Sequence, residues 1–270
     1  MTLTSATTLA RTGATAALAL LLATSAQART INTPFSASDF SDPLDIDNTY
    51  FPLEEGTVFV YKGESPDGCE VDVTTVTSDT KMIAGVTTRV VHDTAYEGET
   101  CTTDPAALVE DTLDYYAQDD SNNVWYFGED TFHCPIFTCE RGEGSWIAGE
   151  DPADSKPGVI MLAQPRNGDT YFQEQAAPNA LDQATVKGTG VKVVLKREDA
   201  YPPGSFTNCI VTKEFSTLEK GAIEQKSYCP GIGNVAVDEH QGKAFHVELT
   251  DGGAAAAATD AFTFRVPPRN

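Results

Sequence analysis

Beyond residue 28, no stretch of the sequence repeats apolar residues with the 3.6-residue period of an amphipathic α-helix. Instead, runs rich in Val, Thr, Tyr and Phe occur, as in residues 56–79 and 84–96, and Gly, Asp, Asn and Pro interrupt them. Such runs are typical of antiparallel strands joined by turns. The sequence therefore predicts an all-β fold built from hairpins, as one or more antiparallel curved sheets or as a barrel-like core.

Similar segments recur along the chain and suggest two related halves. A proline, a glycine and a strand occur at 51–61 and again at 164–175. An aromatic strand that turns and continues occurs at 110–130 and again at 223–240. Chance similarity between β sequences is the alternative. We expect four segments after the N-terminal region: a first β half over 29–132, a connecting loop over 133–160, a second β half over 161–250, and an Ala/Gly-rich spacer and tail over 251–270.

The N-terminal region, residues 1–28, is predicted to be a signal peptide. Its one charge is Arg11, an apolar run follows at 16–23, and Ala26 and Ala28 form an A-x-A cleavage site. A membrane-spanning helix would need about 20 apolar residues, more than this run supplies. We therefore expect an exported protein, secreted or periplasmic, with no transmembrane segment.

The chain is strongly acidic, with 40 Asp and Glu residues, 18 Lys and Arg residues and a net charge of −22. A surface of this sign repels nucleic acids and anionic membranes. The partners we expect are a small molecule, a glycan or an envelope component, and no nucleic acid. Solubility alone is the alternative explanation of the charge, and the sequence leaves the oligomeric state open.

Six cysteines in an exported chain predict a set of disulfides. If residues 218–220 form a three-residue turn, Cys209 and Cys229 face each other at a distance that a disulfide can bridge. The short "HCPIFTC" segment favours a small disulfide loop, with a metal site that includes His133 as the alternative. The third pair follows by elimination. We predict three disulfides: Cys69–Cys101, Cys134–Cys139 and Cys209–Cys229.

The stretch 110–130 predicts a hairpin with two distinct faces. If residues 119–123 form a type I turn followed by a bulge, Asn122 takes the left-handed conformation and Trp125 faces Ala117. One face then forms a core and carries Leu113, Tyr115, Ala117, Trp125 and Phe127. The other face carries Thr112, Asp114, Tyr116, Gln118, Val124 and Tyr126. This second face is either a solvated outer surface or, if the sheet curves, the wall of a cleft.

The cleft interpretation gives the predicted ligand-binding residues: Glu110, Asp114, Tyr116 and Gln118, with Glu174 from the second half. Two such carboxylates could perform acid–base chemistry on a glycosidic bond, with Trp125 or Trp146 stacking on a sugar. A tyrosine could act as the base of a lyase. The sequence lacks the G-x-S-x-G, H-E-x-x-H and phosphate-loop signatures.

We expect a non-catalytic binding protein with a β-lined ligand cleft, and the alternative is a secreted hydrolase or lyase that acts on a glycan or ester. An enzyme should place two carboxylates and an aromatic ring in one pocket, with one carboxyl group desolvated. A binding protein should show a largely apolar cavity, or an exposed aromatic strip, without such a pair.

Calcium is the cofactor that the sequence suggests. Asp42, Asp45 and Asp47 lie close together before Asn48, and hard oxygen ligands of this kind suit Ca²⁺. The segment lacks the glycine and the distal glutamate of an EF-hand loop, so a solvated acidic turn is the alternative. No other cofactor is expected.

Residues 48–235 resemble a widespread group of secreted bacterial β-proteins of unsettled activity. The resemblance is carried by "YAQD" and "NVWYFGE" in the predicted hairpin, and by the "YCPGIG" turn at 228–233. The chain departs from the group at Cys229, where an alanine is expected, in its additional cysteines and in the insert "EGETCTTDP". The resemblance implies a β fold and export, and it implies no particular reaction.

Overall fold

The structure is a computed structural model that describes residues 29–65, 68–135, 138–221, 223–239 and 245–254. The predicted signal peptide and residues 255–270 of the predicted tail lie outside the described residues. Nearly all regular structure in the described part is β-strand, which confirms the all-β prediction. Within these ranges, no helix has the length and apolar character needed to cross a membrane.

Sixteen strands and two short 3₁₀ helices make up the described regular structure. In chain order they are β1 (Arg29–Thr30), η1 (Ala37–Asp39), β2 (Thr57–Ser65), β3 (Gly68–Ile83), β4 (Val86–Gly98), η2 (Pro105–Ala107), β5 (Leu108–Gln118), β6 (Val124–His133), β7 (Glu140–Arg141), β8 (Trp146–Ile147), β9 (Lys156–Met161), β10 (Asp169–Phe172), β11 (Glu174–Gln175), β12 (Asp182–Val194), β13 (Ser205–Ser216), β14 (Ile223–Cys229), β15 (Gly233–Glu239) and β16 (Phe245–Ala254).

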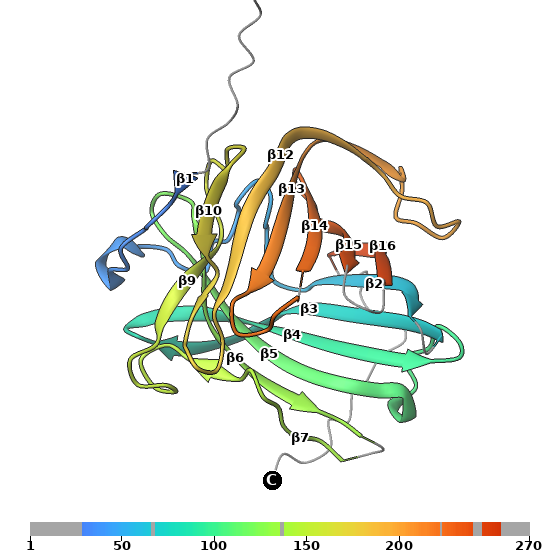
Figure 1. The fold of residues 1–270 in the computed structure, drawn as a ribbon, viewed down its shortest axis with the longest axis horizontal. Helices are drawn as coiled ribbons and strands as arrows, with labels where there is room; N and C mark the ends of the chain where they lie inside the picture. The colour runs from blue at the N-terminus through green and yellow to red at the C-terminus, as the bar shows by residue number, and fades with distance from the viewer. Residues whose placement is uncertain (1–28, 66–67, 136–137, 222, 240–244, 255–270) are drawn as a thin grey trace, which may run out of the picture.

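The strands form one curved sheet in the order β1-β10-β12-β13-β14-β15-β16-β2-β3-β4-β5-β6-β9-β11, and β7 and β8 also pair with β6. The described pairs are antiparallel except β1 with β10. In Figure 1, β2 to β5 lie side by side, and β12 to β14 run across them in another direction. The sheet therefore folds over without closing, so the curved-sheet expectation is confirmed and a closed barrel is not formed.

Most strands of each predicted half are neighbours in this sheet, but β1 of the first half pairs with β10 of the second, and β11 of the second half lies beyond β6 and β9. Strands β2 to β6 are neighbours, strands β12 to β16 are neighbours, and the pairing of β16 with β2 joins the two groups. The sequence repeat itself stays a prediction. The predicted connecting loop contains β7, β8 and most of β9, and β16 continues to Ala254. Residues 251–254, expected to begin a spacer, therefore pair with β2 as a strand.

The hairpin of β5 and β6 has the predicted register. Ala117 pairs with Trp125, and Asn122 is left-handed with φ = 67°. The Asp119 carboxylate organises the turn, since it accepts hydrogen bonds from the backbone N–H of Ser121 and from the Trp125 Nε1–H at 2.8 Å. An Asx-type acceptor of this kind satisfies donors that the turn would otherwise leave unpaired.

Both faces of this hairpin are buried. Trp125 is 2% exposed and packs in an apolar cluster with Phe127 and Trp146, as the core-face prediction requires. On the opposite face, Val124 is fully buried in a second cluster, and the residue exposures of Asp114, Gln118 and Tyr126 are at most 9%. The interpretation of this face as a solvated outer surface is therefore wrong, because the fold of the sheet covers it.

The predicted disulfides are present: Cys69–Cys101, Cys134–Cys139 and Cys209–Cys229. Ile210 pairs with Tyr228, which places Cys209 opposite Cys229 with their Cα atoms 4.2 Å apart. The register that the predicted turn required is therefore confirmed. Because Cys134 is bonded to Cys139, the two thiols are not a ligand set for a metal.

Candidate functional site

A cleft of two adjoining chambers lies within the folded sheet. The larger, called here the aromatic chamber, has a volume of about 580 Å³, and its apolar lining includes Phe51, Phe59, Tyr61, Val91, Tyr228, Val237 and Val247. The smaller, called the carboxylate chamber, has a volume of about 270 Å³, and its lining includes Glu129, Gln173, Glu174, Asp182 and Glu214. The two chambers share Asp93, Glu110, Asp114, Tyr116, Ile160 and Lys226.

Four of the five predicted ligand-binding residues line this cleft. Glu110, Asp114 and Tyr116 line both chambers, and Glu174 lines the carboxylate chamber. The shared-cleft hypothesis required Asp114 and Glu174 to meet, and they line the same cavity. Their role in binding stays a prediction.

Gln118 belongs to the structural framework and not to the lining of either chamber. Its Oε1 accepts from the backbone N–H of Asn48 at 2.9 Å. Its Nε2 donates to the Asp45 carbonyl at 2.9 Å and to the Asp47 carboxylate at 2.7 Å. Gln118 therefore fixes the segment 45–48 against the end of β5.

Acidic side chains dominate the polar lining of the cleft. Eleven such side chains among the described residues line one or both chambers: Glu70, Asp72, Asp93, Glu97, Glu110, Asp114, Glu129, Glu174, Asp182, Glu214 and Glu224. They project from eight strands, β3 to β6 and β11 to β14. In the same described lining, the basic side chains are Lys226 and His133.

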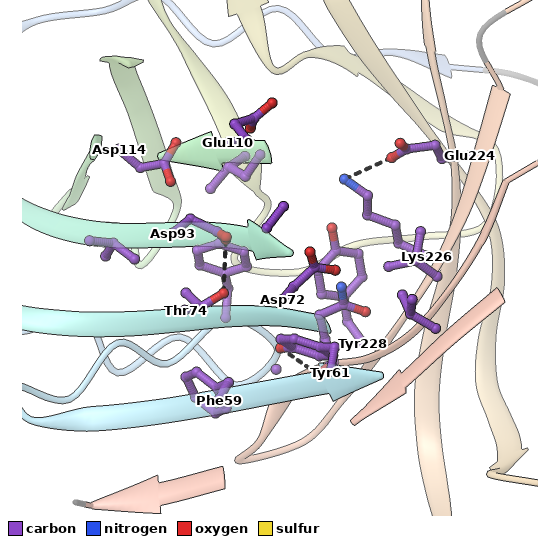
Figure 2. Close-up of a pocket in the computed structure, with 18 of the residues that line it drawn as sticks. Phe59, Tyr61, Asp72, Thr74, Asp93, Glu110, Asp114, Glu224, Lys226 and Tyr228 are labelled. Carbon is purple, nitrogen blue, oxygen red and sulfur yellow. Dashed lines mark hydrogen bonds and ion pairs between the residues drawn. The ribbon is translucent and has the colours of Figure 1, made fainter. Parts of the chain in front are cut away.

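Lys226 shows how the cleft accommodates an ammonium group. Its Nζ lies 3.1 Å from the Glu214 carboxylate and 2.9 Å from the Glu224 carboxylate. Figure 2 shows Lys226 and Glu224 extending from β14 toward Asp72 and Asp93 on the facing strands. Burial alone would lower the pKa of Lys226, but Glu214 and Glu224 outweigh it and raise that pKa well above its ordinary value. The attraction of Lys226 in turn lowers the pKa of Glu224.

The other acidic groups respond to burial and to one another. Burial raises the pKa of Asp93 to about 6 and that of Glu129 to about 7, and the charge of nearby Glu110 adds to both effects. Burial also raises the pKa values of Asp114 and Glu174 well above their usual range, and in both cases the charge of Glu129 is the next cause. These carboxylates therefore crowd one another in a partly dehydrated space.

Tyrosines and a tryptophan hold the carboxylates in place. The Tyr126 hydroxyl donates to Asp114 Oδ1 at 2.5 Å, and the rings of Tyr116 and Tyr126 stack with centroids 4.8 Å apart. Trp146 Nε1–H donates to Glu174 Oε1 at 3.2 Å. Trp146 has no exposed surface and Trp125 packs in the core, so the expectation that either ring stacks on a sugar is wrong.

Glu129 faces the cleft because of a bulge that sequence alternation alone does not show. Asp114 pairs with Glu129 but Tyr116 pairs with Tyr126, so β6 contains an extra residue between these pairs. Gly128 in this bulge has φ = +135°, and an added Cβ would collide with the Trp146 carbonyl. A glycine within a strand is the one sequence signal that could have indicated the bulge.

The predicted calcium ligands lie in a polar surface segment. Asp42, Asp45 and Asp47 are exposed, and Asp47 accepts the hydrogen bond from Gln118. In the part of the chain that is described, no group of three or more His, Cys, Asp or Glu side chains is arranged to hold a metal ion. Calcium binding at this segment stays a prediction without structural support.

Comparisons with known proteins give little further information. No family model matches the chain, and no curated protein matches it significantly. Among solved structures, the chain is similar to a protein described as "a putative lipoprotein from Parabacteroides distasonis ATCC 8503", with a TM-score of 0.35 and 13% identity. The match covers 77% of this chain and 100% of that chain.

Proposed function

We propose that this protein is an exported binding protein that holds a small molecule in the cleft within its folded sheet. The observation that supports this most directly is the aromatic chamber of about 580 Å³. Small-molecule sites are usually concave spaces of about 300–1,000 Å³ with apolar walls and a few convergent polar groups. Here Phe51, Phe59 and Val91 supply an apolar wall, and the carboxylates supply the polar one.

Export is supported by the signal-like N-terminus and by the three disulfides. Disulfides persist in oxidising compartments such as the periplasm or the extracellular space. The same compartment is expected from the resemblance to secreted bacterial β-proteins. Cell fractionation would decide whether the exported protein stays in the periplasm or leaves the cell.

Binding is favoured over catalysis by the electrostatics of the cleft. The pocket meets the crude criterion for an enzyme, since Asp114, Glu129 and Tyr126 share one cavity and the carboxyl groups are desolvated. In acid–base catalysis one carboxyl group stays ionised while the other is held protonated, because their surroundings differ. Here burial raises the pKa values of both Asp114 and Glu129, and the charge of Glu129 adds to the effect on Asp114 while that of Glu110 adds to the effect on Glu129. A crowd of carboxylates shifted in one direction is better suited to receiving a positive charge.

Thermal unfolding in the presence of chemically distinct small molecules tests the binding function. The panel should contain an amine, a neutral sugar, an anionic fatty acid and a neutral aromatic compound. Ala95 of β4 lines the aromatic chamber, so Ala95→Phe should fill part of it. Met82 is 62% exposed and lies outside the lining, so Met82→Phe is the matched control.

We expect at least one class of compound to raise the melting temperature of the parent and of Met82→Phe, but not that of Ala95→Phe. If all three proteins respond equally, the compound binds elsewhere and the cleft is not the site. If no class stabilises the parent protein, the proposed binding function is wrong.

Catalysis on a neutral glycan or an ester is the second candidate. Asp114 and Glu129 are paired across β5 and β6, and most glycosidases use a pair of nearby carboxyl groups. Aryl glycosides and aryl esters should then be hydrolysed by the parent protein, and Glu129→Gln should abolish the reaction. If the parent protein hydrolyses neither kind of substrate, the catalytic candidate is wrong for these substrates and the binding proposal is unaffected.

A further inference from the structure

Gln173 stands out among the residues that line the carboxylate chamber. It is 3% exposed, and its Nε2 is a buried side-chain donor without a hydrogen-bond partner. A buried donor left unpaired loses its hydrogen bonds to water without replacement, so proteins usually satisfy such groups. An oxygen acceptor on a ligand in the chamber would satisfy this one.

Carboxylates surround the same space from several strands. Glu129 belongs to β6, Asp182 to β12 and Glu214 to β13. Because these carboxylates lie on different strands, each can accept a hydrogen bond from a different donor group of a bound molecule. Lys226 Nζ pairs with Glu214 and with Glu224, the second contact being drawn in Figure 2, and these pairs show that an ammonium group is compatible with this wall of the cleft.

Tyr116 provides the third element of recognition. It lines both chambers, it stacks on Tyr126, and its ring meets Phe51 edge-on at 5.4 Å. Aromatic faces attract cations and also pack against the C–H surface of a ring or chain. A ligand that extends from one chamber into the other would therefore pass Tyr116.

We propose that the carboxylate chamber binds the ammonium group of a hydroxylated organic amine, the class that includes amino sugars and amino alcohols, and that Gln173 donates a hydrogen bond to one of its hydroxyl oxygens. This inference rests on the proposed binding function and names its ligand class. The carboxylates accept hydrogen bonds from the N–H and O–H groups of the ligand. Gln173 Nε2–H donates a hydrogen bond to a hydroxyl oxygen, which such a ligand carries beside its charged group. A hydrocarbon amine lacks this acceptor, and a neutral sugar lacks the charge.

Calorimetric titration with three probes separates these contributions. The probes are a β-1,4-linked glucosamine disaccharide, its di-N-acetylated counterpart and 1,4-diaminobutane. The acetylated sugar keeps the hydroxyl groups and loses the charge, whereas the diamine keeps the charge and lacks hydroxyl groups. We expect the glucosamine disaccharide to bind at least about tenfold more tightly than either, the ratio that one charge-assisted hydrogen bond provides.

Two substitutions test the role of Gln173. Gln173→Leu removes an unpaired donor, so the ligand-free protein should unfold at the same or a higher temperature, while affinity for the glucosamine disaccharide should fall roughly two- to tenfold. Tyr171→Phe is the matched control, because the Tyr171 hydroxyl is also buried without a partner but lies outside the lining of both chambers. Tyr171→Phe should leave the affinity unchanged.

Several results would overturn the inference without touching the proposed function. Equal binding of the acetylated and free-amine disaccharides would show that charge plays no part. Unchanged affinity in Gln173→Leu would remove Gln173 from the site, and displacement of the amine by micromolar CaCl₂ would indicate a metal site instead. If none of the three probes binds while another class of the thermal panel shows cleft-dependent stabilisation, the ligand class is wrong and the binding function remains.

Discussion

The crowded carboxylates of the cleft should make this protein lose stability as the pH rises toward neutrality. Burial, followed by the charge of Glu110, raises the pKa of Glu129 from 4.5 to about 7. Between these two values the folded state binds more protons than the unfolded state, so the free energy of unfolding falls as the pH increases. For Asp93, whose folded-state pKa is about 6, the sign is the same.

The size of the effect follows from the pKa values. Each tenfold change in proton affinity corresponds to ~1.4 kcal/mol, so moving the pKa of Glu129 from 4.5 to about 7 costs at most about 3 kcal/mol at pH 8. Glu129 is half-buried, and screening by solvent makes this figure an upper bound. Groups with lowered pKa values, such as Glu224 and Glu248, act in the opposite direction, but only below about pH 4.5. Stability should therefore be greatest at about pH 4.5, because the groups with raised pKa values lower it above that pH and the groups with lowered pKa values lower it below.

Urea unfolding of the parent and of Glu129→Gln between pH 4.5 and 8 measures this. The glutamine keeps the shape and can accept the hydrogen bond that the Thr131 hydroxyl donates to Glu129 at 2.9 Å. Glu129→Gln should match the parent at pH 4.5 and exceed it at pH 8 by up to about 3 kcal/mol, or about 6–12 °C in melting temperature. Glu54→Gln, at an exposed position, is the control and should follow the parent. A parent protein that gains stability from pH 5 to 7.5, or a Glu129→Gln variant that loses as much as the parent, would refute the reasoning.

Three further expectations concern the framework of the fold. Trp125→Ala should lower the free energy of unfolding by about 3–5 kcal/mol, measured by urea titration, because it empties a large buried aromatic site; a change under about 1 kcal/mol would contradict the core assignment. Asp119→Ala should lower the free energy of unfolding by about 1–3 kcal/mol in the same titration, because it leaves the buried Trp125 Nε1–H without its acceptor. The tryptophan fluorescence emission should show no blue shift, because the core around Trp125 stays intact. Peptide mapping of unreduced protein should recover Cys209 linked to Cys229, and replacing both by Ser should cost about 3 kcal/mol for a loop with a sequence separation of 20 residues.

The features that sequence could predict are those that local rules determine. Asn122 tolerates a left-handed conformation, and once the turn is placed, counting fixes Ala117 opposite Trp125. The same counting places Cys209 opposite Cys229. Strand alternation also separated the two faces of the 110–130 hairpin correctly as far as the bulge at Gly128.

The composition of the cleft depends on contacts between distant segments, which alternation does not encode. The pairing of β16 with β2 brings Lys226 and Glu224 of β14 within reach of β3 and β4. No local feature of the sequence predicts this pairing. Trp146 is buried, packs on Tyr126 and donates a hydrogen bond to Glu174, so its ring is not the free stacking surface that the sequence suggests. Gln118 was assigned to the correct face, but the segment 45–48 occupies its amide.

The same carboxylates should affect stability and binding in opposite directions, and this separates a functional cluster from an incidental one. Removing the charge of Glu129 relieves repulsion with Glu110 and Glu174, so the ligand-free variant gains stability at neutral pH. It also removes one partner for a cationic ligand, so affinity for the glucosamine disaccharide should fall. A carboxylate whose role was to hold the fold together would show the reverse, since its neutralisation would destabilise the ligand-free protein. Sites that retain destabilising groups commonly do so for function, because each such group lowers the stability of the protein that carries it.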